Sequence, residues 1–283
     1  MTRPIAFQGA RYAFSEMAAR QFFGQQIECI PCKTFDNVFE SVDAGEAQYG
    51  VIPIENSLTG SIHRNFDLLL EHDLKIVGEV FLRVEQNLIA NPGVSLEEIH
   101  TIYSHPQALE QCRVFLQSLP DVESVASYDT AGSVKMIRDK KMHNAAAIAS
   151  KMAADTYGMN ILKESIEDIP ENFTRFYILS RQTETFTHAD KTSVVFSMKN
   201  IPGALFKALS VFSLRDIDLL KIESRPLRGK PWVYIFYLDF AGNMAEEHCQ
   251  NAIRHLEEIT NFIKVLGSYP SGHTHENNNK QSN

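Results

Sequence analysis

Short apolar runs alternate with amphipathic segments over the first 180 residues of the chain. The run at 49–54 (Tyr-Gly-Val-Ile-Pro-Ile) is typical of a buried strand, and it ends in polar residues. The spacing of Ala18, Ala19 and Phe22 predicts a helix that turns these three side chains inward. Because strands and helices alternate at a regular pitch, the pattern predicts an α/β domain with a largely parallel sheet.

The other elements of this region follow from the same pattern. A helix is expected to begin at Asp36, as its N-cap, and to end at Gly45. Strands are expected at 4–7, 27–30, 99–104, 122–128, 145–149, 161–169 and 175–180, with two more inside 75–91. Further helices are expected at 13–23, 61–70, 107–116, from Thr130 onward, and at 151–157.

The pattern changes after the polar stretch 182–190, which lacks apolar periodicity and is expected to separate two domains. Beyond it the expected order is strand, helix, strand, strand, helix, strand, which is the ferredoxin-like βαββαβ order. The polar tail at 270–283 has no apolar anchor and is expected to be disordered. The expected elements lie at 191–198, 203–214, 217–225, 232–240, 245–259 and 263–267.

Charge and composition exclude several classes of partner. The formal net charge of -8 leaves no basic face to neutralise phosphates, which argues against nucleic acid. No run of about 18 apolar residues is present, so no membrane span is expected. The start of the chain has no apolar signal-peptide stretch, and a cytoplasmic location is expected.

No motif for a metal or cofactor is evident. Cys29 and Cys32 have CxxC spacing, but no second CxxC or HxxxH completes a site, so the four cysteines are expected to be small apolar fillers. No group of His, Asp and Glu has metal spacing, and no Walker sequence, dinucleotide fingerprint or GxSxG motif occurs. We therefore expect neither metal nor cofactor.

Three polar clusters follow predicted strands or lie within them, at 53–57 (Pro-Ile-Glu-Asn-Ser), 104–107 (Ser-His-Pro-Gln) and 172–176 (Asn-Phe-Thr-Arg-Phe). Hydroxyls, amides and one Arg without a cofactor motif predict a cleft that binds a small oxygen-rich anion. Plainer alternatives stay open: Ser61 and Thr130 are also good helix N-caps, and His105 suits capping or positioning better than acid catalysis.

These clusters, in this order, resemble the prephenate dehydratase family over nearly the whole chain. The resemblance also rests on 7–15, Gly60-Ser61, 108–112, 129–131 and 146–149. The carboxy-terminal unit is similar to an ACT regulatory domain, through 203–205 (Gly-Ala-Leu) and 223–226 (Glu-Ser-Arg-Pro). The family usually has a second glycine where Tyr12 stands. No helical chorismate mutase segment precedes Pro4, so the chain resembles the monofunctional form.

The resemblance implies the activity and the site. Prephenate, a dianion, would lose carbon dioxide and hydroxide to give phenylpyruvate in L-phenylalanine biosynthesis, without a cofactor. Thr174 would hydrogen-bond the leaving hydroxyl, Arg175 would hold a carboxylate, and Phe176 would form an apolar wall against the ring. The implied substrate-binding residues are Gly9, Asn56, Ser57, Gly60, Ser104, His105, Gln107 and Thr130.

The resemblance further implies a two-lobed catalytic domain at 1–182, similar to periplasmic binding proteins, and an ACT domain at 191–269. ACT domains usually pair, so a homodimer or homotetramer is expected, with L-phenylalanine as feedback inhibitor at the paired interface. The implied effector-binding residues are Gly203, Ala204, Leu205, Glu223, Ser224, Arg225 and Pro226. Two alternatives stay open: an arogenate dehydratase, and a non-catalytic amino-acid sensor.

Overall fold

The computed structural model describes residues 4–119, 121–182, 186, 188–227, 229–230 and 232–272. The chain divides into two compact units. Unit 1 comprises Met1–Phe66 and Val80–Phe176, and unit 2 comprises Asp67–Glu79 and Tyr177–Asn283. Part of the predicted boundary at 182–190, and the predicted tail beyond residue 272, lie outside the described residues.

One sheet has the strand order β2-β1-β3-β11-β5, and the short strand β4 pairs with the end of β3. β1 runs parallel to both β2 and β3, so their carboxyl ends lie at one edge. β3 is buried along its length except at Glu55, as expected for a strand covered on both faces. The strands are β1 (Pro4–Gln8), β2 (Glu28–Cys32), β3 (Tyr49–Asn56), β4 (Gly60–Ser61), β5 (Lys75–Arg83) and β11 (Phe173–Ser180).

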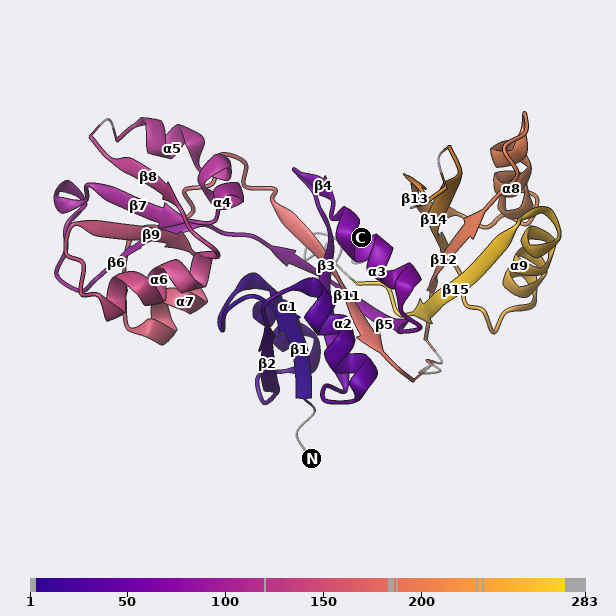
Figure 1. Cartoon of the computed structure of the whole chain (residues 1–283), viewed down its shortest axis with the longest axis horizontal. Helices are drawn as coiled ribbons and strands as arrows, with labels where there is room; N and C mark the ends of the chain where they lie inside the picture. Colours follow the sequence, from indigo (N-terminus) through magenta and orange to yellow (C-terminus); the bar gives the residue numbers. More distant parts are fainter. Residues whose placement is uncertain are drawn as a thin grey trace, which may run out of the picture. The chain divides into compact units, whose positions relative to one another are not determined.

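Unit 1 contains a second sheet, of order β10-β6-β9-β7-β8. It is mixed rather than largely parallel, because β6, which receives the chain from β5, runs antiparallel to β9 and β10. Helices α4 and α5 cover one face and α6 and α7 the other (Figure 1). The strands are β6 (Asn87–Ala90), β7 (Thr101–Ser104), β8 (Glu123–Ala126), β9 (Ala145–Ala149) and β10 (Asn160–Lys163), with a 3-10 turn η1 (Leu96–Glu98).

Helix ends differ from the sequence prediction in their caps. Thr34, not Asp36, caps α2, because its Oγ1 accepts a hydrogen bond from the Asn37 N–H at 3.2 Å. The helix predicted at 107–116 is interrupted at Cys112 and forms two short helices. The side chain of Phe22, which was predicted to turn inward, is 41% exposed. The helices are α1 (Phe14–Phe23), α2 (Phe35–Ala44), α3 (His63–Glu71), α4 (Pro106–Gln111), α5 (Arg113–Gln117), α6 (Thr130–Asp139) and α7 (Lys151–Tyr157).

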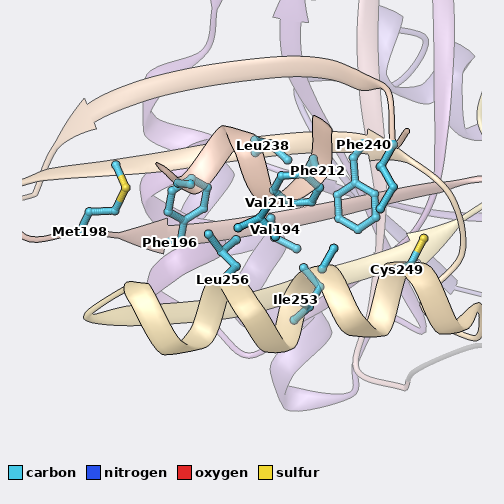
Figure 2. Close-up of a cluster of buried hydrophobic side chains, with 13 residues drawn as sticks. Val194, Phe196, Met198, Val211, Phe212, Leu238, Phe240, Cys249, Ile253 and Leu256 are labelled. Atoms are coloured by element: carbon cyan, nitrogen blue, oxygen red, sulfur yellow. The ribbon is translucent and has the colours of Figure 1, made fainter. Parts of the chain in front are cut away.

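Unit 2 contains an antiparallel sheet of order β13-β14-β12-β15, with α8 and α9 packed on one face. The chain order is the predicted βαββαβ order. Figure 2 shows the core between sheet and helices, in which Val194 and Phe196 of β12 meet Ile253 and Leu256 of α9. The elements are β12 (Lys191–Ser197), α8 (Ala204–Ser213), β13 (Leu219–Pro226), β14 (Tyr234–Ala241), α9 (Glu247–Ile259) and β15 (Phe262–Tyr269).

The other face of this sheet carries a buried polar network. Ser193 Oγ donates to Asp239 Oδ1 at 2.6 Å and lies 2.6 Å from the Tyr269 hydroxyl, while the Tyr177 hydroxyl lies 3.4 Å from the same carboxylate. Along the described residues, no helix is both long and apolar enough to cross a bilayer.

Candidate functional site

A cavity of about 370 Å³ in unit 1 collects residues that follow several strands. Gly9 comes after β1, Asn56 ends β3, His105 follows β7 and Thr130 follows β8, while Thr174 lies in β11. Gly9, Asn56 and Thr174 come from the first sheet of the chain, while His105 and Thr130 come from the second sheet, so both sheets contribute polar groups to this cavity. The structure brings seven residues implied by the resemblance to this cavity: Gly9, Asn56, His105, Gln107, Thr130, Thr174 and Phe176.

The Thr174 hydroxyl is buried and held in a defined orientation by Asn56. Asn56 Nδ2 lies 3.0 Å from Thr174 Oγ1 and 2.7 Å from Asn172 Oδ1, and Asn56 Oδ1 accepts the Leu58 and Thr59 N–H groups, each at 3.1 Å. Backbone N–H groups only donate, so the amide oxygen of Asn56 faces them and its NH₂ faces Thr174. Thr174 Oγ1 therefore accepts from Asn56 and keeps its own hydrogen for another acceptor.

Strand geometry separates the three residues 174–176. Side chains alternate across a strand, so Thr174 and Phe176 lie on the face that lines the cavity and Arg175 lies on the opposite face. The Arg175 guanidinium carbon lies 5.9 Å from the centre of the Phe81 ring, and the side chain is buried. The structure does not bring Arg175 to the cavity.

Three other implied residues also lie outside the cavity lining. Ser57 joins the turn after β3 to the start of β11: its N–H donates to the Phe173 carbonyl at 2.8 Å, and its Oγ accepts from the Phe173 N–H at 2.9 Å. Ser104 is fully buried and donates to the Ile148 carbonyl at 2.7 Å. Gly60 pairs with Asn56 in the β3–β4 hairpin with φ 80. Their contacts are structural.

His105 and Gln107 lie at the start of α4. His105 Nδ1 accepts the Gln107 N–H at 3.2 Å, which makes His105 the N-cap, and Gln107 Nε2 donates to Thr59 Oγ1 at 2.9 Å. The N-cap of α6 is Asp129, not Thr130, since the Gly132 N–H donates to the Asp129 carboxylate. Thr130 is thus left free to face the cavity.

The first turn of α1, which follows the first loop of the chain, offers backbone donors to the cavity. Gly9 has φ 113 and Tyr12 has φ 71, so the loop turns sharply before α1. Ala13, the N-cap of α1, supplies no side-chain acceptor, so nothing on its side chain occupies the N–H groups of the first turn, where Phe14 and Ser15 line the cavity. An uncapped helix N-terminus is a ready anion-binding element.

Among the described residues, the cavity wall contains one carboxylate, that of Asp129, and no Lys or Arg. A bound anion would therefore be held by neutral donors and by the N-terminus of α1, rather than by a side-chain cation. The sequence analysis quoted Gln8 and Ser15 within the motif 7–15 and Gln111 within the motif 108–112, but it did not assign these three residues of the wall to the site.

A second cavity, of about 350 Å³, lies in unit 2. The residues at 203–205 line it, together with the aromatic rings of Trp232, Tyr234 and Phe236. The residues at 223–226 do not line it. They lie on the neighbouring strand, where Ser224 pairs with Phe236 and Pro226 with Tyr234. Glu223 lies 3.7 Å from Lys221, and Arg225 lies 3.3 Å from Asp67.

The CxxC pair has none of the properties of a reactive dithiol. Burial raises the pKa of the Cys29 thiol to about 11, with a further contribution from the negative charge of Glu16, and burial also raises the pKa of Cys32. Reactive cysteines have a lowered pKa. The described residues do contain a group with metal-ligand geometry that the sequence analysis did not anticipate, formed by Glu246, His248 and Cys249.

Comparison with known proteins identifies the family. The family model described as "Prephenate dehydratase" matches residues 5–184. An Arabidopsis thaliana relative, "Arogenate dehydratase/prephenate dehydratase 2, chloroplastic", is 49% identical over 277 residues, which are 94% of this chain and 72% of that protein.

Two solved structures are similar over almost the whole chain. A prephenate dehydratase from Arthrobacter aurescens, solved in complex with L-Phe, is 34% identical with a TM-score of 0.86 over 94% of this chain and 89% of that one. GqqA, described as a novel type of quorum quenching acylase, is 35% identical with a TM-score of 0.85 over 95% and 98%. The chain belongs to the prephenate dehydratase family of α/β lyases, enzymes that dehydrate and decarboxylate their substrate.

Proposed function

We propose that this protein converts prephenate to phenylpyruvate, water and carbon dioxide. The observation that carries the proposal is the environment of Thr174, whose hydroxyl accepts from Asn56 at 3.0 Å on the wall of the cavity. A hydroxyl held in this way is a directed donor. It is suited to an oxygen that gains negative charge as it leaves.

The reaction breaks two bonds of the prephenate ring. The bond to the ring carboxylate breaks and releases carbon dioxide, and its electron pair forms the aromatic ring as the ring hydroxyl leaves with the electrons of its C–O bond. Thr174 donates a hydrogen bond to that hydroxyl, and a proton from water completes the product water. An unperturbed Thr hydroxyl is a poor acid, so its contribution is hydrogen-bond stabilisation, worth about 10²–10⁴-fold in rate. Aromatisation drives the step, so no electron sink is needed.

The two carboxylates would be held by neutral donors. The N-terminal N–H groups of α1, the amides of Gln8 and Gln107 and the hydroxyl of Thr130 all lie on the cavity wall. Phe176 offers an apolar face to the ring. Direct contact between Arg175 and a carboxylate is not part of the proposal, because that side chain lies on the opposite face of β11.

The cavity favours dehydration over acyl transfer, the activity named for GqqA. A Thr or Ser nucleophile needs a base that takes its proton. Thr174 is hydrogen-bonded to an amide donor, and His105 Nδ1 accepts a backbone N–H, so in the described residues neither forms a nucleophile–base pair with the other. A pure amino-acid sensor would not need a directed hydroxyl on the cavity wall.

The direct test is phenylpyruvate formation from prephenate by wild type, Thr174→Ser and Thr174→Ala. Ser keeps the hydroxyl and is expected to retain part of the rate, whereas Ala is expected to lower kcat at least about a hundredfold. Thr101→Ala, in β7 and outside the cavity lining, is the matched control and should keep the wild-type rate. An Ala variant as fast as wild type would contradict the assignment of Thr174.

The same assay separates prephenate from arogenate, which differs at one side-chain substituent. We expect kcat/KM to be higher for prephenate than for arogenate. The reverse ratio would make the protein an arogenate dehydratase, the other activity named for the Arabidopsis relative. Absence of turnover on both substrates, with L-phenylalanine still bound, would make it a sensor.

We further propose that unit 2 holds an ACT regulatory domain at 191–269 through which L-phenylalanine inhibits. The cavity lined by Gly203, Ala204 and Leu205 combines helix-start backbone with aromatic rings, which suits an aromatic amino acid. The residues at 223–226 lie outside it in one chain, and we assign them to the cavity of a second copy. The supporting observations are that β13 is an edge strand and that Leu220 and Ile222 on it are 46% and 44% exposed.

The test introduces a charged side chain on β13. Ile222→Lys is expected to reduce the mass measured by light scattering to that of a monomer and to weaken phenylalanine inhibition at least about tenfold, because a buried charge costs far more than an exposed one. Turnover without phenylalanine should stay at the wild-type rate. Val114→Lys, which charges an exposed apolar residue of unit 1, is the control. A monomer with full inhibition would contradict the shared cavity.

A further inference from the structure

Three different metal-binding side chains meet at the start of α9, outside both cavities. Glu246 is the N-cap of the helix, and His248 and Cys249 lie in its first turn. His248 Nε2 lies 3.4 Å from Glu246 Oε2 and 3.5 Å from Cys249 Sγ, and Cys249 Sγ lies 3.9 Å from the same carboxylate oxygen. We refer to these three residues as the Glu246–Cys249 cluster.

The separations are those that a tetrahedral ion imposes on its ligands. Zinc bonds of about 2.3 Å to sulfur and about 2.0–2.2 Å to nitrogen and oxygen, at tetrahedral angles, place N and O about 3.4 Å apart and S about 3.6 Å from each. Two observed distances, 3.4 and 3.5 Å, agree with these values, and the third, 3.9 Å, is slightly longer. If Glu246 and His248 formed only an ion pair next to the core residue Cys249, the three donor atoms would not need to lie this close together.

Gly242 lies beside the three donor atoms and, having no side chain, leaves room for them. A Cβ on Gly242 would lie 2.5 Å from Cys249 Sγ, 3.7 Å from Glu246 Oε2 and 3.9 Å from His248 Nε2. All three donor atoms therefore lie within 3.9 Å of the point where a side chain of residue 242 would begin. The backbone is fixed there, since the Gly242 N–H donates to the Asp190 carbonyl at 2.8 Å and the Gly242 carbonyl accepts from Thr192 Oγ1 at 2.7 Å.

We propose that the Glu246–Cys249 cluster binds one zinc ion, with the Glu246 carboxylate, His248 Nε2 and Cys249 Sγ as ligands and a water molecule in the fourth position. One thiolate, one imidazole and one carboxylate suit zinc better than calcium or magnesium, which prefer oxygen ligands. The side chains of Glu246 and His248 are about half exposed, at 49% and 51%, so an ion has a route from solvent.

The sulfur ligand connects this site to the core of unit 2. Cys249 is fully buried and belongs to the hydrophobic core cluster, at whose edge Figure 2 shows it. Zinc binds the thiolate, so the ion must displace the proton of the free thiol when it binds. Bound zinc would then hold the N-cap and the first turn of α9 together, and would stabilise unit 2.

Cobalt(II) titration tests the site, because cobalt takes the same ligands and a cobalt–thiolate bond absorbs in the near ultraviolet. The background for all variants is His273→Asn with His275→Asn, which removes the other closely spaced histidines near the chain's end. The otherwise unchanged chain is expected to develop thiolate and tetrahedral cobalt bands that saturate at one equivalent and disappear when zinc is added.

Two variants and one control complete the design. His248→Gln changes a half-exposed side chain and is expected to weaken cobalt binding at least about tenfold while unit 2 stays folded. Cys249→Ser should abolish the thiolate band. Cys32→Ser, which removes a cysteine of unit 1, should leave both bands unchanged.

Zinc should also raise the unfolding temperature of the chain with intact ligands, but it should not raise the unfolding temperature of the His248→Gln variant. This measurement does not depend on the cobalt spectrum. No thiolate band in the chain with intact ligands, or a band that Cys249→Ser retains, would overturn the proposal. Equal binding by His248→Gln would overturn the ligand assignment.

Discussion

At the residue scale, Tyr12 combines an unfavourable backbone conformation with a favourable side-chain contact. Its φ of 71 lies in the left-handed region, which costs an L residue about 1–2 kcal/mol. Its ring packs edge-on against Tyr157 with 5.5 Å between centroids, and its N–H donates to Glu16 Oε2 at 2.7 Å. The sequence flagged this position only because a glycine was expected there, and the backbone explains why glycine suits it.

The first prediction compares the stabilities of the alanine and glycine variants at position 12. Tyr12→Ala and Tyr12→Gly both lose the ring, but only Ala keeps the left-handed strain. The Gly variant is therefore expected to be more stable than the Ala variant by about 1 kcal/mol in urea unfolding.

Lys135, exposed in the middle of α6, is the control. At this position, Lys135→Ala should be more stable than Lys135→Gly by about 1 kcal/mol, as in an ordinary helix. If the alanine variant were more stable than the glycine variant at both positions, the proposed strain at Tyr12 would be contradicted.

At the scale of elements, the start of α6 balances a cap against helix propensity. The Gly132 N–H donates to the Asp129 carboxylate, and a Cβ on Gly132 would lie 2.8 Å from Asp129 Oδ1. Glycine inside a helix costs about 1 kcal/mol relative to alanine, and an aspartate cap contributes about 1 kcal/mol. The glycine is thus the residue that leaves room for the cap, beside Thr130 on the cavity wall.

The second prediction is a coupling between these two residues. Gly132→Ala should leave the free energy of unfolding nearly unchanged, because the gain in propensity is offset by a displaced cap. In the Asp129→Ala background, the same substitution should stabilise by about 1 kcal/mol.

Urea unfolding of the four proteins measures this coupling. Asp129→Ala alone should cost about 1 kcal/mol. Additive effects would show that the cap and the glycine do not interact.

At the scale of the whole molecule, unit 2 contains a buried ion pair between segments distant in sequence. Lys191 Nζ lies 2.6 Å from Glu79 Oε1, with 9% and 0% of the two side chains exposed, and the Gly272 N–H donates to the same oxygen at 2.9 Å. This pair joins β5 to β12 and brings residues 67–79 into unit 2, whereas the sequence predicted a break only at 182–190.

The third prediction concerns the cost of breaking that pair. Lys191→Met removes the cation beside a buried carboxylate and should destabilise unit 2 by about 3–5 kcal/mol. Replacing both partners, as Glu79→Leu with Lys191→Met, should cost less than Lys191→Met alone, because no buried charge is left.

The exposed pair Lys151–Glu164, with 63% and 65% exposure, is the control, and Lys151→Met should change stability by less than about 1 kcal/mol. Denaturant unfolding measures all four proteins. A double variant worse than the single one would mean that the pair itself, and not the unpaired charge, determines stability.

The sequence by itself determined the order of elements in both units and seven of the residues on the cavity wall. Apolar periodicity records which faces are buried, and polar residues that follow apolar strands mark candidate site positions. The three polar clusters predicted one cleft that contains Asn56, His105 and Thr174, and the family resemblance added Gly9 and Thr130.

The tertiary structure alone decided which neighbours point where and which distant groups meet. The alternation along β11 turns Arg175 away from the cavity that Thr174 and Phe176 line, although the three are consecutive. The direction of β6, the pairing of Glu79 with Lys191, and the convergence of Glu246, His248 and Cys249 beside Gly242 depend on how the chain packs. Local periodicity fixes the face a residue occupies, but only packing fixes what that face meets.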